Sequence, residues 1–117
     1  MTEPTKLFAQ GDVILERVAD ATPTTPTNVD PDGAVVLARG EVTGHRHAFY
    51  SNAVMFRDDA LARGMPAELY LGHVKIAAKE GAALRHEEHD TITLPPGTYR
   101  VRRQREWDAN EARIVAD

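Results

Sequence analysis

Five histidines are the residues of this sequence best suited to chemistry, and four of them fall into two close pairs. His45 and His47 form a His-x-His pair, while His86 and His89 enclose two glutamates. On an extended strand, residues i and i+2 point to the same face with their Cα atoms about 7 Å apart. The first pair can therefore direct two imidazole rings into one space.

The second pair is spaced i, i+3, so its rings diverge on a strand and converge only in a turn. The simplest shared site is a triad of His45, His47 and either His86 or His89, with Glu88 or Glu41 as a possible carboxylate. Three ligands with an open coordination position are typical of catalytic zinc and of non-haem iron. The pattern predicts a divalent transition metal (zinc, iron or manganese) held by the four paired histidines. Glu88 is the candidate catalytic group for proton transfer, in a metal-dependent enzyme of unknown substrate.

Two other interpretations of the histidines remain open. Histidines beside glycines and charged residues are common at exposed turns, and the run of Glu87 and Glu88 is typical of a solvated loop. A metal-free acid/base or ligand-binding pocket needs only one imidazole, because the pKa of an unperturbed histidine is about 6.5. His73 stands alone in a predicted strand, where we expect it to be half-buried and hydrogen-bonded to the backbone.

The composition limits what else the protein can do. A chain of 117 residues is long enough for one domain with a sizeable core, and it has no cysteine for disulfides or thiolate metal sites. Its net charge of −4 argues against broad attraction to nucleic acids or anionic membranes. No apolar stretch could span a bilayer and no signal peptide is recognisable, so we expect a soluble cytoplasmic protein.

Short strands separated by turn residues run along the chain and must position these side chains. Apolar and β-branched residues predict strands at 11–18, 34–39, 45–50, 53–57, 68–71, 74–78, 83–86, 91–94 and 98–107, with an edge strand at 112–115. An acidic start, alanines and a final glycine predict one or two helical turns over 58–64. The pattern predicts an all-β fold, a small single-domain β-barrel or sandwich with at most one short helix.

One β-rich domain is expected to span residues 1–117, with a Thr/Pro-rich loop at 21–33. Three prolines in that loop prevent a regular strand ladder. Loops of this length are either functional or mobile, and the composition of this one favours mobility.

The last long strand offers an alternative site. Strict alternation would place Arg103, Arg105 and Trp107 on one face, where guanidinium planes and an aromatic ring can bind phosphate or stack on a base. That face would suit a non-enzymatic interaction module, such as a phage or host adaptor that binds protein or nucleic acid. The simpler interpretation is an amphipathic edge strand whose arginines pair with acids. A third is a structural barrel that works as a homo-oligomer.

The chain resembles a family of short uncharacterised bacterial and phage proteins along nearly its whole length. The segments that carry the resemblance are 10–13, 40–47, 86–89, 94–99 and 104–107. This resemblance implies no activity for any residue.

Gly40, His45 and His47 also resemble the start of the first motif of cupins, small β-barrels that hold a metal with His-x-His and later ligands. The chain departs from that motif, because no glutamate follows His47 by three or four residues. A further resemblance, to the co-chaperonin barrel, lies in residues 11–17 and 35–42. Both resemblances imply a barrel, and the first implies a metal site.

Overall fold

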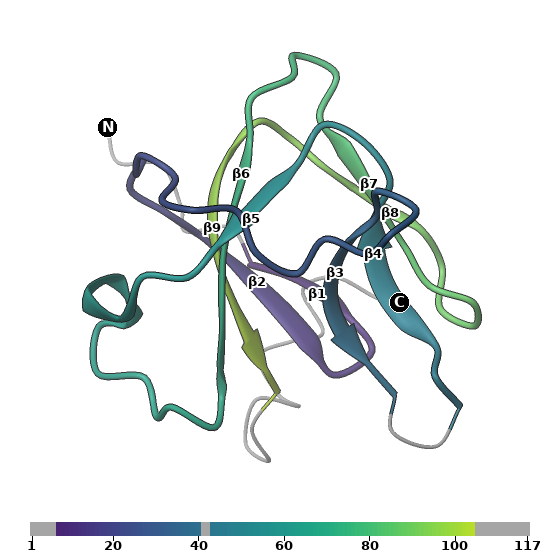
Figure 1. The fold of residues 1–117 in the computed structure, drawn as a ribbon, viewed down its shortest axis with the longest axis horizontal. Helices are drawn as coiled ribbons and strands as arrows, with labels where there is room; N and C mark the ends of the chain where they lie inside the picture. Colours follow the sequence, from purple (N-terminus) through teal and green to yellow (C-terminus); the bar gives the residue numbers. More distant parts are fainter. Residues whose placement is uncertain (1–6, 41–42, 105–117) are drawn as a thin grey trace.

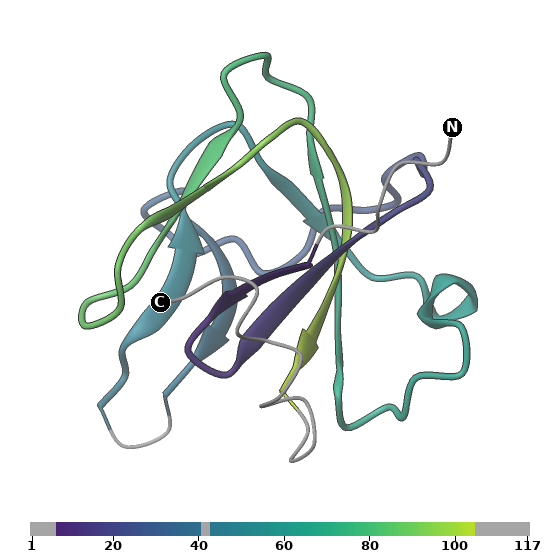
Figure 2. The same ribbon diagram turned by 180° about the vertical axis from the view of Figure 1, so that it is seen from behind.

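The computed structural model describes residues 7–40 and 43–104, which form two antiparallel β-sheets (Figure 1). One sheet has five strands, in the order β1 (Leu7–Gln10), β2 (Val13–Val18), β9 (Gly97–Arg103), β6 (Tyr70–Ile76) and β5 (Val54–Phe56). The other has four, in the order β3 (Val35–Arg39), β4 (Arg46–Phe49), β7 (Ala82–Arg85) and β8 (Ile92–Leu94). The predicted all-β fold is confirmed, and it is a sandwich rather than a closed barrel, as the reverse view also shows (Figure 2).

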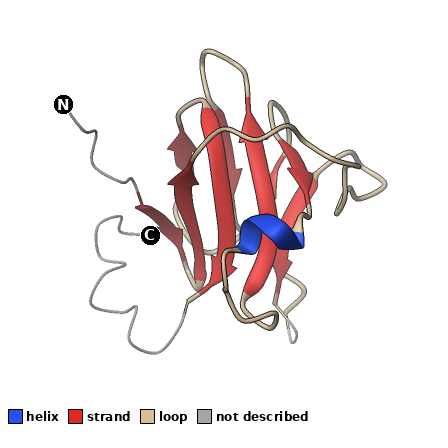
Figure 3. Cartoon of the chain, turned by 90° about the vertical axis from the view of Figure 1, so that its left-hand side faces the viewer, coloured by secondary structure: helices blue, strands red, loops and turns tan. Residues whose placement is uncertain are grey.

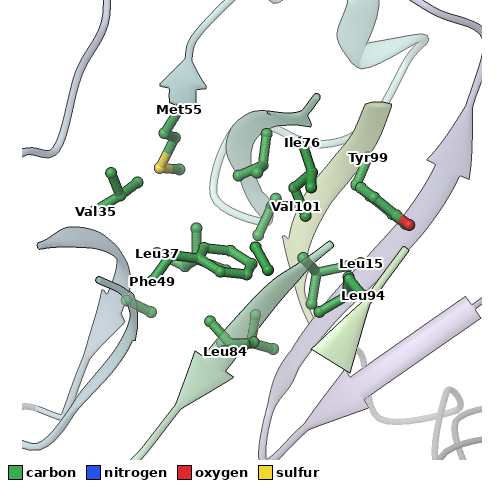
Figure 4. Close-up of a cluster of buried hydrophobic side chains, with 14 residues drawn as sticks. Leu15, Val35, Leu37, Phe49, Met55, Ile76, Leu84, Leu94, Tyr99 and Val101 are labelled. Carbon is green, nitrogen blue, oxygen red and sulfur yellow. The ribbon is translucent and has the colours of Figure 1, made fainter. Parts of the chain in front are cut away.

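Inward-facing side chains of both sheets fill the space between them (Figure 4). Leu15 of β2 and Val101 of β9 are fully buried partners in the register, and Phe49 of β4 meets them from the opposite sheet. Burial of each such side chain contributes roughly 1.5–3 kcal/mol. Tyr99 is buried too, and its hydroxyl donates a hydrogen bond of 2.6 Å to the carbonyl of Pro95. The apolar residues that alternate with polar ones along these strands therefore form one continuous layer between the two sheets.

The Thr/Pro-rich loop closes the side of the sandwich between the edge strands β5 and β3. The amide of Thr27 donates to Met55 O at 2.9 Å, and the amide of Val36 donates to Asn28 O at 2.9 Å. Arg46, on the outer face of β4, binds the two loop carboxylates at 2.6 and 2.5 Å, those of Asp30 and Asp32. The expected loop is present, and these contacts argue against the mobility that its composition favours.

Hydrogen bonds with arginines lower the pKa values of both loop acids. The pKa of Asp30 is lowered mainly by its hydrogen bond with Arg39, and that of Asp32 mainly by its bond with Arg46. Arg46 thus turns away from the two histidines that flank it and holds the loop on the opposite face of the strand.

A 3-10 helical turn, η1 (Asp59–Ala62), lies over the outer face of the five-stranded sheet (Figure 3). The carboxylate of Asp58 caps it by accepting from the amide of Ala60 at 3.1 Å, as the acidic start of this segment predicted. Arg100 of β9 donates to Ala62 O at 2.8 Å and so ties the turn to the sheet. No helix in the described part of the chain is long and apolar enough to cross a membrane.

Several predicted strand boundaries were wrong. The strand β1 was missed, because only Leu7 and Phe8 in it favour a strand. The two strands predicted at 68–71 and 74–78 are one strand, β6, with a register shift beside Gly72. The strand β9 lies at the centre of its sheet rather than at an edge. The strand predicted at 112–115 and the end of that at 98–107 lie outside the described residues.

Glu16 neutralises two arginines on the outer face of the five-stranded sheet, and its loss should destabilise the fold. Its carboxylate pairs with Arg100 at 2.9 Å and with Arg102, whose side chain is 4% exposed. Glu16→Gln should lower the free energy of unfolding by about 3 kcal/mol, because it removes the carboxylate that pairs with both of these largely buried cations. Urea denaturation at pH 7 measures this. The exposed Glu80→Gln is the control, and an equal small effect of both variants would contradict the prediction.

Candidate functional site

The two histidine pairs meet because of the register between β4 and β7. Continued by a few residues beyond its last pair, that register places His47 opposite His86 and His45 opposite Glu88. Directly opposite residues of antiparallel strands point to the same face. The rings of His47 and His86 accordingly have centroids 4.3 Å apart, and His45 Nδ1 lies 3.1 Å from Glu88 Oε1. The pairing of strands, rather than proximity in the sequence, assembles the cluster.

A bend after β7 brings His89 back towards His86. The Nδ1 atom of His86 accepts hydrogen bonds from the amides of Glu88 at 3.0 Å and His89 at 3.2 Å. The two rings then lie with their centroids 4.7 Å apart. His86 and His89 thus converge in a bend of the chain, as their i, i+3 spacing requires for two rings to meet.

Two histidines and one carboxylate form the tightest group. His45, His86 and Glu87 each offer a ligand atom, and these three atoms lie within 4.8 Å of one another. Glu87 also accepts a hydrogen bond from the amide of Arg46 at 2.9 Å, which is the main cause of its lowered pKa. The carboxylate of this group is therefore Glu87, whereas Glu88 contacts His45. Glu41 lies outside the described residues.

Gln10 fixes the orientation of His47. Its side-chain nitrogen donates to the carbonyl oxygens of Leu84 and Asp90, both at 2.9 Å. Carbonyl oxygens only accept, so the amide oxygen must face His47 Nδ1, which it meets at 2.9 Å. His47 thus donates from Nδ1 and keeps the lone pair on Nε2. A second hydrogen bond of this kind orients histidine ligands in metal sites.

The turn between β1 and β2 forms one wall of the cluster. Gly11 has φ +57°, and a Cβ atom there would lie 2.7 Å from His89 Nε2 and 3.2 Å from His47 Cε1. Only glycine leaves room for both rings and adopts this backbone conformation without strain. The next residue, Asp12, has one carboxylate oxygen 3.7 Å from His47 Nε2 and the other 3.2 Å from Arg103 Nη1.

Burial keeps two of these imidazoles neutral at pH 7. Loss of solvent is the main cause that lowers the pKa of His47 to about 4, and the neighbouring His86 adds to it. The pKa of His86 is lowered by burial and by His89. Neutral imidazole is the form that binds a metal ion, so the folded protein presents ligands without first losing a proton.

The residues of this cluster lie within a segment that matches a known domain family. The profile of a domain of unknown function, DUF8820, matches residues 9–104. The chain belongs to this family. The predicted membership of an uncharacterised family is thereby confirmed, and the DUF8820 match includes Gln10, Asp12 and all five histidines. No curated protein and no solved structure matches the chain.

In the structure, the described arginines of the last strand pair with acids. Arg103 is half-buried and paired with Asp12, while Arg105 and Trp107 lie outside the described residues. Arg100 and Arg102 pair with Glu16, so the arginines do meet acids, although in a central strand.

The environment of His73 was also predicted wrongly. Its side chain is buried rather than half-buried, and its Nδ1 lies 2.7 Å from the Tyr70 hydroxyl rather than bonded to the backbone. The ring is remote from the four paired histidines, on the outer face of the five-stranded sheet.

Sequence reasoning gave no role to Gln10, Asp12 or Gly11 of the DUF8820 domain. The available signal was weak: a glutamine beside a Gly-Asp turn, between two apolar segments. A glutamine in such a place is expected to be buried and then requires hydrogen-bond partners, but only the packing of the two sheets shows which ones.

Removing the side-chain amide of Gln10 should destabilise the protein and should no longer hold the proton of His47 on Nδ1. Gln10→Met leaves the Leu84 and Asp90 carbonyls and His47 Nδ1 without that partner, which should cost about 3 kcal/mol. Urea denaturation measures the loss, and ¹⁵N NMR of the imidazoles should show His47 protonated at Nδ1 only in the parent protein. Gln104→Met is the matched control. A parent His47 protonated at Nε2 would contradict the assignment.

The lowered histidine pKa values predict a loss of stability in mild acid. The unfolded chain binds a proton at His47 near the ordinary pKa of about 6.5, but the folded chain binds it only near pH 4. Stability is therefore complete above pH 6.5 and should fall by about 3 kcal/mol from this residue as the pH drops towards 4. Urea denaturation in chelator measures it between pH 7 and 4.5. His47→Gln should give a flatter profile, and an equally steep one would contradict this cause.

Proposed function

We propose that this DUF8820 domain binds a divalent transition metal at the end of the sandwich where β4 and β7 meet the β1–β2 turn. The observation that carries the proposal is the group of ligand atoms from His45, His86 and Glu87, all within 4.8 Å of one another. Ligand atoms around one zinc ion lie about 3.3 Å apart, so the distances within the group would shorten by up to about 1.5 Å on loading. His47 and His89 stand beside it as further ligands.

The protonation states support this assignment. Glu87 is ionised and His86 is neutral at pH 7, because their pKa values are lowered. The Nε2 lone pair of His47 is made available by Gln10. An oxygen and several nitrogens with no thiolate suit zinc, iron or manganese.

Metal binding should be coupled to the bend that follows β7. In the neutral ring of His86, Nδ1 accepts two amide hydrogen bonds, so the proton sits on Nε2. A metal at Nδ1 displaces those bonds directly. A metal at Nε2 moves the proton to Nδ1, where it faces two donors. Either way, the amides of Glu88 and His89 should change environment when the metal binds.

The group of two histidines and one carboxylate leaves coordination positions open. Such a set is known from non-haem iron centres, and open positions distinguish catalytic from structural zinc sites. A bound metal would supply activated water for hydrolysis or a centre for oxygen chemistry. Glu88, 3.1 Å from His45 Nδ1, is the residue that would move protons at its edge.

The alternative of an interaction module receives less support. Of the face made by Arg103, Arg105 and Trp107, the described residues include only Arg103, and its guanidinium already pairs with Asp12. We therefore place the function at the histidine cluster.

Metal analysis of protein purified without an affinity tag tests the proposal. We expect about one zinc, iron or manganese ion per chain, and micromolar or tighter binding of Zn²⁺ by calorimetry after treatment with chelator. The double variant His45→Ala, Glu87→Gln should bind Zn²⁺ at least about 100-fold more weakly, because it loses two ligands.

Glu80→Gln, an exposed change in the turn between β6 and β7, is the matched control and should bind like the parent. In NMR spectra, Zn²⁺ should shift the amides of Glu88 and His89 in the parent but not in the double variant. Binding that is unchanged in the double variant, or a parent protein that binds less than one ion in ten chains, would overturn the proposal.

A further inference from the structure

A cavity lies away from the histidine cluster, between η1 and the outer face of the five-stranded sheet. Its volume is about 530 Å³, within the range of small-molecule pockets. The end of β2 and the residues after it supply apolar walls, including Val18 and Ala21, and Leu61 of η1 covers the opposite side. These walls suit a ligand with an apolar body.

The floor of this pocket belongs to a row of polar residues that crosses three strands. Glu16 of β2 is the register partner of Arg100 in β9, and Arg100 is in turn the partner of His73 in β6. Arg100 and His73 both line the pocket. Since His73 is 1% exposed, its ring is part of the fixed floor rather than a mobile surface group.

Arg100 is incompletely satisfied. One terminal nitrogen donates to Ala62 O at 2.8 Å and the other to Glu16 Oε2 at 2.9 Å, while Nε is buried with no hydrogen-bond partner among the described residues. Guanidinium has five N–H donors, so each terminal nitrogen retains a second one. An unsatisfied buried donor is unfavourable, and the usual compensation is an acceptor.

The wall of the pocket also carries cations. Arg100, in the lining, pairs with the carboxylate of Glu16 at 2.9 Å. Arg63, which ends η1 at φ +57°, adds a second cation to the wall. Among the described residues of the lining, the one acid is Asp20, but Thr98 at 2.8 Å and Lys75 at 3.1 Å hold it and lower its pKa.

We propose that this pocket binds a small carboxylate with an apolar body, the carboxylate at Arg100 and Arg63 and the body against Val18 and Leu61. Arginine binds planar carboxylates through paired hydrogen bonds, which gives it the specificity that a point charge lacks. His73, neutral because burial and Arg100 lower its pKa, adds a hydrogen-bonding group without adding charge. The pocket is independent of the proposed metal site.

NMR titration of the full-length ¹⁵N-labelled protein with benzoate tests this proposal. The Nε–H of Arg100 exchanges slowly with water because it is buried, so its resonance should be visible and should shift in a saturable manner. Benzamide has the same body without the charge, and acetate has the charge without the body. Each should bind at least about tenfold more weakly than benzoate.

Two variants locate the binding. Arg63→Gln should weaken benzoate binding about tenfold, and Leu61→Trp, which fills the cavity, should abolish it. Arg85→Gln, an exposed change on β7 in the other sheet, is the matched control and should bind like the parent. If Leu61→Trp does not fold, the comparison of Arg63→Gln with Arg85→Gln decides. A shift that rises linearly without saturation, equal binding of benzamide, or no effect of Arg63→Gln would overturn the proposal.

Discussion

The buried carboxamide of Gln10 joins the two sheets at the end where the histidines gather. Its nitrogen satisfies two carbonyl oxygens of the four-stranded sheet and the loop that leads out of it, and its oxygen accepts from His47. A glutamine with no exposed surface must find such partners, since a buried polar group without them is strongly unfavourable. This one side chain therefore ties β1 to β7 and to the chain at Asp90, and it fixes which nitrogen of His47 carries the proton.

Each strand of the sandwich has two chemically different faces, and the chain uses both. In β4, His47 faces the other sheet while Arg46 faces outward and holds the loop carboxylates. In β9, Val101 lies in the core while Arg100 faces η1. This separation places a cluster of imidazoles at one end of the sandwich and a pocket with two arginines in its wall on one outer face.

Local patterns in the sequence predicted much of the fold, because most strands carry β-branched or apolar residues between turn residues. They could not choose between barrel and sandwich, since that depends on which strands pair at the edges. Strand alternation alone predicted that His45 and His47 share one face, and both rings contact His86. The contribution of His86 and Glu87 depends on the register of β7 and on a bend held by His86 itself, and Gln10 enters from the opposite sheet. Contacts of this kind are not encoded in local spacing.

The absence of a Cβ atom at Gly11 helps to compare the geometry of the site between members of the family. A methyl group at this position would crowd the His89 and His47 rings, so the present arrangement of the two rings requires glycine here. A relative that keeps the four paired histidines but replaces this glycine must shift the His89 ring or the first hairpin. Glycine at this position is thus a sequence marker for members that preserve the geometry, and it can be read without any structure.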